Sequence, residues 1–433
     1  MKEKAIAVAI PFFLALIALE MGVDRRRRRR GAEPLYRFAD SITSLACGVG
    51  QQMLAALVVT AIGVGAYTFF YDRFRVLEVS QSSVVLWILA FVGTDLGYYA
   101  YHRASHRINF FWATHVVHHQ SEEYNLSTAL RQSWFTSLTS WLFYVPLAIL
   151  GVSPFVFVTC LTFNTLYQFW IHTRAIGKLG LVERVMNTPS HHRIHHAIDP
   201  EYIDKNYAGV FITWDKLFGT FVEEGVEPNY GTVKPLASMN SFWANFEGFA
   251  RLWQMSRATE SWKDKLLVWV MPPEWQPEDL GGIVTVPHVD RDARVKYDVM
   301  KNRALFRYIG VQFVGAAGLV FGVLWYASEL GVLDKAALVS VTFLTLATWG
   351  ALLERRAWAM PTESARLVLL GLALAWVFRA SDLVLYVAAG WACFAAASAY
   401  GLVASVREDR ARRDDAAARA QADDRDGTLE PAG

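Results

Sequence analysis

Nine apolar segments constrain the fold of this chain more than any other feature of its sequence. Of its 433 residues, 54% are hydrophobic, 14% aromatic and only 19% charged, which is too apolar for an ordinary soluble domain. A helix that crosses a bilayer needs about 20 residues, and several segments reach that length. The segments are Ala5–Val23, Ile42–Tyr71, Val84–Tyr101, Trp134–Leu150, Phe155–His172, Phe306–Tyr326, Ala336–Leu353, Ala365–Val377 and Leu383–Val406. The sequence therefore predicts an all-α fold, a polytopic bundle of transmembrane helices.

An unbroken arginine run, Arg25 to Arg30, indicates how the bundle is oriented. The run follows the first apolar segment, whereas in a signal peptide basic residues precede it. Under the positive-inside rule this end lies in the cytoplasm. Alternating the later segments, with a tight external turn at Gly151–Pro154, returns Tyr101 and His172 to the cytoplasmic side. High Ala and Arg usage suggests a bacterial inner membrane.

Charge and cysteine content exclude other classes of function. The net charge of +2 gives no basic field that would suggest nucleic acid as a partner. The three cysteines, Cys47, Cys160 and Cys393, are isolated in apolar runs, and no CxxC pair exists. Neither a disulfide framework nor a thiolate metal site is indicated, so we expect buried thiols.

These patterns divide the chain into five regions. Residues 1–82 form N-terminal spans with the arginine-rich cytoplasmic loop, and residues 83–235 form the catalytic region. Residues 236–304 form a cytoplasmic or interfacial region, in which Trp243–Val270 is expected to be an amphipathic helix at the membrane surface. Residues 305–406 form the C-terminal spans. Residues 407–433 form a charged, Ala-rich tail that is disordered or a frayed helix.

Ten of the eleven histidines lie between His102 and His196, at the edges of the apolar segments. Residues three or four positions apart share a helical face, so each cluster presents two or three imidazoles together. The clusters are His102 and His106; His115, His118 and His119; and His192, His195 and His196. Imidazole is a good ligand for first-row transition metals. Eight ligands are too many for one ion and enough for two, with open positions for dioxygen or water.

Several nearby residues could belong to the same site. His172 is expected to complete the metal shell, although it could simply hydrogen-bond at the interface. His191 points about 100° away from its neighbour on a helix, so ligation and a supporting role stay open. His288 is expected to be uninvolved. Asp95 lies two helical turns before His102, and we expect its carboxylate to hydrogen-bond a ligand imidazole in the catalytic site.

The metal itself is expected to be iron. Structural zinc needs only four ligands and often includes cysteine. An all-histidine site with surplus ligands fits iron redox chemistry better. The fold class is thus a transmembrane helical bundle with a cytoplasmic-facing, histidine-rich di-iron site.

The HxxxH, HxxHH and HxxHH series and its flanking segments resemble the fatty acid hydroxylase and sterol desaturase superfamily of membrane di-iron enzymes. The resemblance is strongest to its ether-lipid monooxygenases and covers roughly residues 90–225. The matching segments are Asp95–Arg103, Glu122–Ser133, Leu166–Thr173, Asn187–His196, Ile203–Val210 and Trp214–Phe221.

This resemblance implies a ligand set, a cosubstrate and a substrate class. The implied ligands are His102, His106, His115, His118, His119, His192, His195 and His196. The resemblance also implies two iron ions, dioxygen as cosubstrate and a lipid drawn from the bilayer. In the ether-lipid enzymes the carbon beside the ether oxygen is hydroxylated, and the product collapses to a fatty aldehyde and a free glycerol.

The electron donor stays open. A reduced pterin supplies electrons in the animal members of the family, which carry an acidic residue directly after the second histidine. Here that position is Arg107. The donor is therefore a tetrahydropterin or an electron-transfer protein, such as a ferredoxin or a cytochrome.

Two other functions compete with ether-lipid cleavage. The same chemistry could hydroxylate or desaturate a sterol, a fatty acyl chain or a carotenoid-like lipid. A non-catalytic metal-binding or transport protein would be expected to carry ionisable residues through several spans, whereas here the histidines gather at one face.

Overall fold

The computed structural model describes residues 2–291 and 293–427, and the regular elements within them are helices. The long helices are α1 Lys2–Arg28, α2 Phe38–Leu54, α3 Thr60–Phe74, α4 Val84–Arg107, α8 Pro154–Trp170, α11 Ser241–Ala258, α13 Arg303–Trp325, α14 Val332–Leu353, α15 Ala359–Val377 and α16 Val384–Gly427. The shorter ones are α5 Asn109–His119, α6 Thr136–Ser140, α7 Val145–Ile149, α9 Pro189–His195, α10 Thr213–Leu217 and α12 Trp262–Leu267. Within these ranges, extended pairing is limited to two isolated bridges, Met186 with Phe211 and Ala197 with Tyr230. The all-α prediction is confirmed.

Within the described residues, six helices are long and apolar enough to cross a membrane. They span Ile6–Arg28, Val84–Arg107, Arg303–Trp325, Val332–Leu353, Ala359–Val377 and Val384–Arg412. A seventh span is counted if the bent pair Phe38–Leu57 and Ile62–Phe74 is one crossing, with a bend of 49°. A π-helical turn, Ala55–Val59, separates α2 from α3, and such turns commonly kink helices. This bend accounts for the excess length of the second predicted segment.

The fourth and fifth predicted segments do not form full-length crossings. Trp134–Leu150 is divided into α6, a 3₁₀ turn at Trp141–Tyr144 and α7, and Pro146 leaves one backbone acceptor without an amide donor. The helix α8 has 17 residues, about 26 Å at 1.5 Å per residue, against a hydrocarbon core of about 30 Å. The turn between them is as predicted, with Gly151 at φ +95°. The two segments were predicted to cross the membrane and return. Removing both crossings together therefore leaves the alternation of the later spans unchanged.

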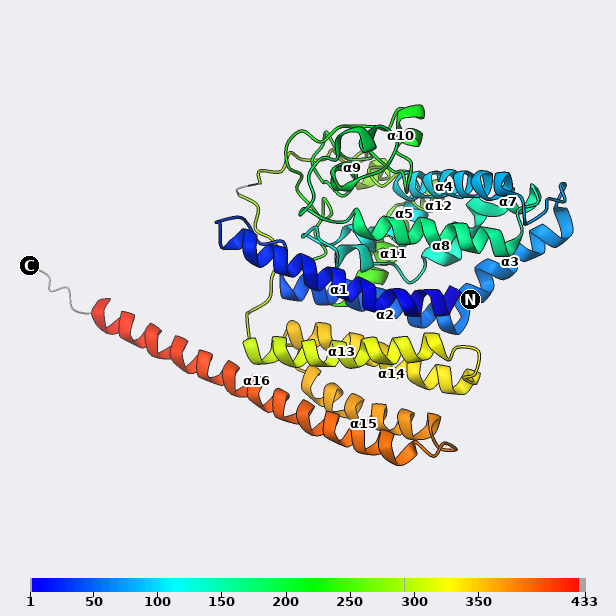
Figure 1. Ribbon diagram of the computed structural model, residues 1–433. Coiled ribbons are helices and arrows are strands. Elements are labelled where there is room, and N and C mark those ends of the chain that lie inside the picture. Colours follow the sequence, from blue (N-terminus) through cyan, green and yellow to red (C-terminus); the bar gives the residue numbers. More distant parts are fainter. Residues whose placement is uncertain (1, 292, 428–433) are drawn as a thin grey trace, which may run out of the picture.

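The helices lie in layers that hold the histidine-bearing ends in one place. Figure 1 shows α13 to α16 on one side, α1 and α2 in the middle, and α4 and α8 beyond them. The helix α4 packs against both α5 and α8, and α11 covers α5. The main core lies between the N-terminal and C-terminal layers and includes Ile42, Trp134, Ile309 and Trp349.

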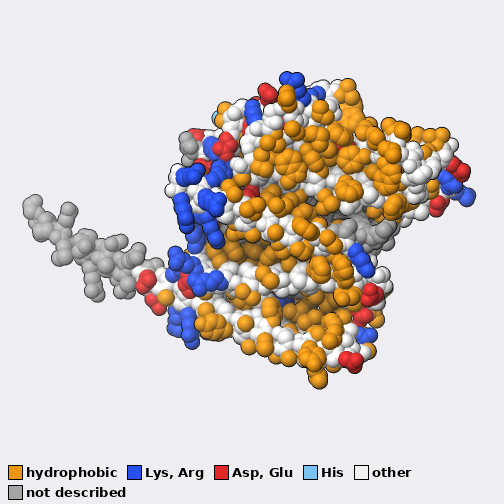
Figure 2. Space-filling model, in the orientation of Figure 1, with side chains coloured by type: hydrophobic (Ala, Val, Ile, Leu, Met, Phe, Trp, Pro, Cys, Tyr) orange, Lys and Arg blue, Asp and Glu red, His pale blue; other side chains and the backbone are white. Residues whose placement is uncertain are grey.

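The arginine run and the histidine-bearing helix ends point toward the same end of the bundle. In Figure 1, α1 ends on the side toward which α4 and α8 also run. Figure 2 shows Lys and Arg side chains gathered at that end and hydrophobic side chains covering the bundle beyond it. The alternation of spans likewise predicted that the arginine run and the histidine-bearing ends lie on the same side of the membrane.

The region after residue 236 differs from its prediction in one detail. The expected helix Trp243–Val270 is two helices, α11 and α12, separated at Thr259–Ser261. Ser261 caps α12 by accepting a hydrogen bond from the Asp264 amide, and such a cap starts a new helix. Trp253 and Trp262 on these helices are exposed, at 58% and 81%.

The structure also bears on the expected C-terminal tail and on the three cysteines. The helix α16 continues to Gly427, so the helical alternative holds for the described part of the tail, with an ion pair from Arg412 to Glu408 one turn apart. Cys47 and Cys160 are buried as expected, but Cys393 is exposed. Cys393 lies on α16, at the outside of the bundle, where one face of the helix is free of protein contacts.

Candidate metal centre

Nine buried histidines form two adjacent groups that could each hold a metal ion. In each group one ring nitrogen per histidine lies within 4.8 Å of all the others. The first group consists of His102, His106, His115, His119 and His195, and the second of His118, His172, His192 and His196. The groups adjoin, since the rings of His119 and His196 stack at 4.4 Å. All nine histidines predicted as metal ligands, His172 included, are members.

The helical spacing divides each HxxHH motif between the two groups. On α5, His115 and His119 are one turn apart and face the first group, while His118 faces the second. In the α9 motif, His192 and His196 belong to the second group and His195 reaches the first. The helix α4 supplies His102 and His106, and His172 follows the end of α8. Each HxxHH motif therefore contributes ligands to both groups, whereas the HxxxH motif on α4 contributes to the first group only.

Backbone carbonyls orient four of the imidazoles through their Nδ1 atoms. His102 Nδ1 donates to the Tyr207 carbonyl at 2.7 Å, and His172 Nδ1 donates to the Gln168 carbonyl at 2.7 Å. His118 and His195 make the same contact, at 3.1 Å, with the carbonyls of Arg131 and Lys205. A carbonyl accepts and cannot donate, so Nδ1 carries the hydrogen and Nε2 keeps its lone pair. Carbonyl partners of this kind are typical of metal-ligating histidines.

The free Nε2 atoms converge in a way that fits a bound cation. In the first group, His115 Nε2 lies 3.0 Å from His102 Nε2 and 3.1 Å from His119 Nε2. In the second, His172 Nε2 lies 3.2 Å from His118 Nε2 and 3.0 Å from His192 Nε2. In the His118–His172 pair both Nδ1 atoms carry their hydrogens, so the two Nε2 atoms oppose lone pair to lone pair. A cation between them relieves that repulsion.

Three further ring nitrogens support the same fit. The Nε2 atoms of His106, His195 and His196 are buried and have no hydrogen-bond partner among the described residues. A buried polar atom without a partner is costly. An ion in the first group would satisfy His106 and His195, and an ion in the second would satisfy His196. Nine imidazoles and no thiolate or carboxylate in the groups suit iron.

Burial keeps these imidazoles neutral and therefore able to bind a metal. It lowers the pKa of His118 to about 4. It also holds the pKa of His119 and His195 well below the ordinary imidazole value, with neighbouring histidines adding to the effect. Since a metal binds the deprotonated ring, the ligands need lose no proton at neutral pH.

Asp95 supports the site through a loop instead of through an imidazole. The described hydrogen bonds to its carboxylate come from the amides of Val210 and Phe211, at 2.8 and 3.0 Å, and from the side chains of Trp214 and Asn164. The predicted contact with a ligand imidazole is therefore wrong. The reason is that the loop containing Gly209 lies against Asp95, where an added Cβ would come within 2.8 Å of Oδ1. That loop carries the Tyr207 carbonyl that orients His102.

Two aspartates that the sequence did not single out hold the same side of the site. Asp215 accepts hydrogen bonds from the amides of Tyr207 and Ala208, both at 2.8 Å. Asp204 lies 3.6 Å from His106 Nδ1 and also pairs with Arg107. Burial opposes its ionisation, but these two neighbours hold the pKa of Asp204 below its ordinary value. Asp215 lies in the Trp214–Phe221 segment, and membership of that segment was the only feature of the sequence that could have pointed to it.

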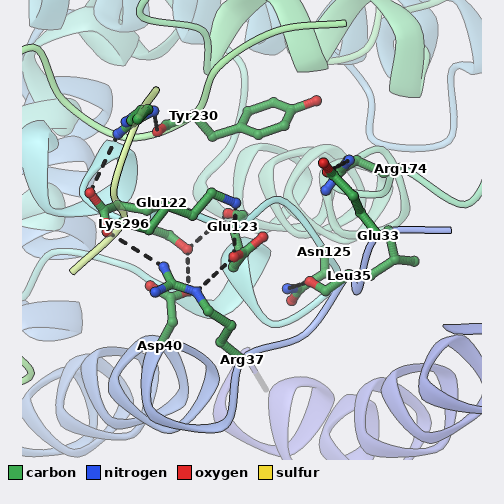
Figure 3. A network of polar contacts seen from close by, with 12 residues as sticks. Glu33, Leu35, Arg37, Asp40, Glu122, Glu123, Asn125, Arg174, Tyr230 and Lys296 are labelled. Carbon is green, nitrogen blue, oxygen red and sulfur yellow. Dashed lines mark hydrogen bonds and ion pairs between the residues drawn. The ribbon is translucent and has the colours of Figure 1, made fainter. Parts of the chain in front are cut away.

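Ion pairs fix the loop that leaves α5. Figure 3 shows Glu122 and Glu123 facing Arg37 and Lys296. Arg37 lies 2.7 Å from Glu123, and Lys296 lies 2.9 Å from the same carboxylate. The Tyr297 amide donates to Glu122 at 2.7 Å. The segment after His119 is therefore tied to the start of α2 and to the irregular segment around residue 297.

The remaining histidines lie outside both groups. His191 is buried against Phe221, with ring centroids 5.4 Å apart. Its Nδ1 atom has no partner among the described residues. His288 is exposed, as its position in a Pro-containing loop suggested.

Comparisons with known proteins identify the class of protein first. Residues 87–220, which contain all nine histidines, match the sequence model of the fatty acid hydroxylase family. Alkylglycerol monooxygenase of Danio rerio is 38% identical over 369 residues, 85% of this chain and 81% of that protein. The human alkylglycerol monooxygenase is 39% identical over 362 residues, 83% of this chain and 80% of that protein. The chain therefore belongs to the alkylglycerol monooxygenase family of multi-pass membrane enzymes.

More distant similarity is confined to the histidine-bearing region. Human cholesterol 25-hydroxylase is 27% identical over 139 residues, 29% of this chain and 47% of that protein. No solved structure matches the chain significantly.

Proposed function

We propose that this protein is a membrane-bound di-iron monooxygenase that hydroxylates the ether-adjacent carbon of alkylglycerol-type lipids. The main support for this proposal is the pair of adjacent, buried, all-histidine groups. The chain that carries them matches alkylglycerol monooxygenases over four-fifths of their length. Dioxygen, two electrons and two protons convert the ether carbon to a hemiacetal and give one water. The hemiacetal then collapses to a fatty aldehyde and free glycerol.

The chain's own residues would hold the two ions, enclose the reacting carbon and orient the imidazole rings. Iron, when bound, supplies the reduction of dioxygen and an oxidant able to attack an unactivated carbon. His102, His118 and their partners fix the two ions, and the carbonyls behind them fix the rings. The ligand side chains are buried, between 1% and 7% exposed, so the protein excludes bulk water from the reacting carbon.

The site is proposed to face the cytoplasm of a bacterial cell, in the inner membrane. The arginine run and the histidine-bearing ends of α4 and α8 lie toward the same end of the bundle, which is the end that the positive-inside rule assigns to the cytoplasm. A lipid would enter from the bilayer with its tail between the spans and its head near this end. The five-region division of the chain, with residues 83–235 as the catalytic region, is part of the same proposal.

Arg107 bears on the electron donor. Its guanidinium lies 2.8 Å from Glu274 and pairs with Asp204, so it occupies the position beside His106 as a cation engaged by two carboxylates. Animal family members are expected to place an acid there for a pterin. This departure favours an electron-transfer protein of ferredoxin or cytochrome type over a tetrahydropterin.

Activity screening tests the proposal. The purified protein in lipid vesicles would receive an alkylglycerol and oxygen, with a tetrahydropterin or with a ferredoxin and its reductase in parallel. We expect oxygen-dependent release of fatty aldehyde, which is absent in the His195→Ala variant. Hydroxylation of a sterol, fatty acyl or carotenoid lipid without aldehyde release would contradict it, and the similarity to cholesterol 25-hydroxylase makes a sterol the first alternative to include.

A further inference from the structure

Glu20 is a buried carboxylate in the first membrane-length helix. It lies on α1, within the span Ile6–Arg28, and only 4% of the residue is exposed. An ionisable group inside a span is expensive and is usually functional. Glu20 lies outside residues 87–220, the part of the chain that matches the fatty acid hydroxylase family.

The Glu20 carboxylate joins two segments that carry or follow histidines of the metal centre. Its Oε1 accepts a hydrogen bond from the Thr173 hydroxyl. Its Oε2 accepts hydrogen bonds from the Leu126 amide, at 2.8 Å, and from the Tyr36 hydroxyl. Thr173 directly follows His172, and Leu126 lies in the loop that leaves α5 after His119.

Thr173 extends this connection to the third histidine motif. Its carbonyl accepts a hydrogen bond from Arg193 Nη1 at 2.9 Å, and Arg193 directly follows His192 on α9. Glu20 thus contacts the residue after His172 directly, through its side chain, and is linked through that residue to Arg193, which follows His192.

The loop containing Leu126 also touches the second histidine group directly. The Tyr124 ring stacks on His172, with centroids 5.7 Å apart, and its hydroxyl donates to the Ile171 carbonyl at 3.0 Å. Asn125 donates to the Leu35 carbonyl at 2.7 Å, as Figure 3 shows. Fixing Leu126 therefore fixes the aromatic wall of the second group.

The first histidine group has a different set of supports. Asp95, Asp204 and Asp215 hold the loop that carries the Lys205 and Tyr207 carbonyls. The described contacts of Glu20 are with Thr173, Leu126 and Tyr36, and do not include that loop. The two groups are thus anchored separately, one from within residues 87–220 and the other from α1.

We propose that Glu20 is a positioning residue for the second histidine group. It holds the segments at residues 124–126 and 171–173 in register, so that His118, His172, His192 and His196 meet around one ion. The inference rests on the two-metal centre of the proposed function. It predicts that loss of Glu20 weakens the second ion and spares the first.

Metal binding to four forms of the full-length protein tests this inference. Wild type, Glu20→Gln, Thr173→Val and Tyr36→Phe would be purified in detergent, checked for monodispersity and titrated anaerobically with Co²⁺, following its visible absorption and the ions bound per chain. Thr173→Val and Tyr36→Phe are matched, because each removes one hydroxyl from the same carboxylate. Only Thr173 adjoins a histidine of the centre.

The wild type is expected to bind two ions, one per group. Glu20→Gln and Thr173→Val should bind the second ion about 10- to 100-fold more weakly, as for other changes behind a ligand. Tyr36→Phe should behave as wild type. If Glu20→Gln does not fold, Thr173→Val carries the test alone.

The outcomes separate the two proposals. Two tight ions in Thr173→Val, or equal weakening of both ions, would overturn the role of Glu20 and leave the metal centre standing. Failure of the wild type itself to bind two ions would instead overturn the metal centre.

Discussion

Neighbouring histidines on one helix belong to different groups of this site. His118 and His119 are adjacent on α5, yet His118 belongs to the four-histidine group and His119 to the five-histidine group. A step of one residue turns a side chain by about 100° on a helix, which is enough to cross from one group to the other. Each HxxHH motif therefore joins the two groups through one short segment of the chain.

This division predicts different defects for two adjacent substitutions. His118→Ala should empty the second group and leave the first occupied, while His119→Ala should do the reverse. Iron per chain should fall from about two to about one in both variants, since each group supplies one ion's ligands, and turnover should be lost. Mössbauer spectra of the remaining iron should differ between the variants, and identical residual spectra would count against the division.

Asp95→Asn should weaken the site without unfolding the protein. Asparagine keeps the shape of the side chain but offers only one acceptor oxygen. At least one of three donors therefore loses its partner: the Val210 amide, the Phe211 amide or the Trp214 indole. An unsatisfied buried donor costs about 1–3 kcal/mol, and the Tyr207 carbonyl behind His102 should shift. We expect metal affinity to fall about 10- to 100-fold, measured by titration.

A matched change elsewhere provides the control for Asp95→Asn. Asp199→Asn alters a carboxylate that accepts hydrogen bonds from Asn229. Asp199 is a member of neither histidine group. Wild-type affinity in Asp95→Asn, or equal weakening in Asp199→Asn, would contradict the supporting role of Asp95.

At this scale the sequence identified all nine histidines of the groups, because helical spacing fixes which side chains share a face. It could not assign His118 and His119 to separate ions, since that depends on how α4, α5, α8 and α9 meet. It also could not find the carbonyls of Tyr207 and Lys205, because a backbone acceptor has no side-chain signature. Asp95 was found, but its partner was a loop more than a hundred residues away.

At the scale of elements, α11 lies between a helix of the metal centre and an exposed aromatic surface. One face of α11 packs on α5, the helix that carries His115 to His119. The other face exposes Trp253 and Phe246, at 58% and 46%. Exposed tryptophans prefer the membrane–water interface, so this pair should lie in the headgroup region beside the site.

Spin labelling measures that depth. In a Cys393→Ser background, a nitroxide at Trp253→Cys should be more accessible to lipid-soluble oxygen than to a water-soluble nickel chelate. The control label at Glu260→Cys, in the exposed break between the two helices, should show the opposite preference. Equal access of the nickel chelate to both labels would refute an interfacial α11.

Hydropathy predicted these elements unequally well. Phe306–Tyr326 and Leu383–Val406 each became part of a single helix, whereas the longer Ile42–Tyr71 is divided and bent at the π-helical turn Ala55–Val59. Trp134–Leu150 and Phe155–His172 were equally apolar but formed a short hairpin beside α4. Apolar composition alone does not distinguish a short helix packed against protein from one that crosses the bilayer.

At the scale of the whole molecule, the arrangement of spans fixes where both ends of the chain lie. The hairpin of α7 and α8 changes no orientation, so the later spans α13 to α16 alternate as predicted. Arg355 and Arg356 after α14, and Arg407 to Arg412 at the end of the membrane-length part of α16, should then share the cytoplasmic side with the arginine run.

Reporter fusions test this topology. A fluorescent reporter that matures only in the cytoplasm, fused after Gly433, should be bright, whereas one fused after Glu329 between α13 and α14 should be dark. The reverse pattern would place the metal centre on the outer side of the membrane and contradict the proposed localisation.

The iron content of the purified, active protein tests the central claim most directly. Two groups of buried imidazoles, each with converging lone pairs, predict about two iron ions per chain, together with oxygen-dependent aldehyde release from an alkylglycerol. In His118→Ala the iron content should fall to about one ion per chain, and aldehyde release should be lost. Stoichiometric zinc with no turnover on any lipid would contradict a di-iron monooxygenase.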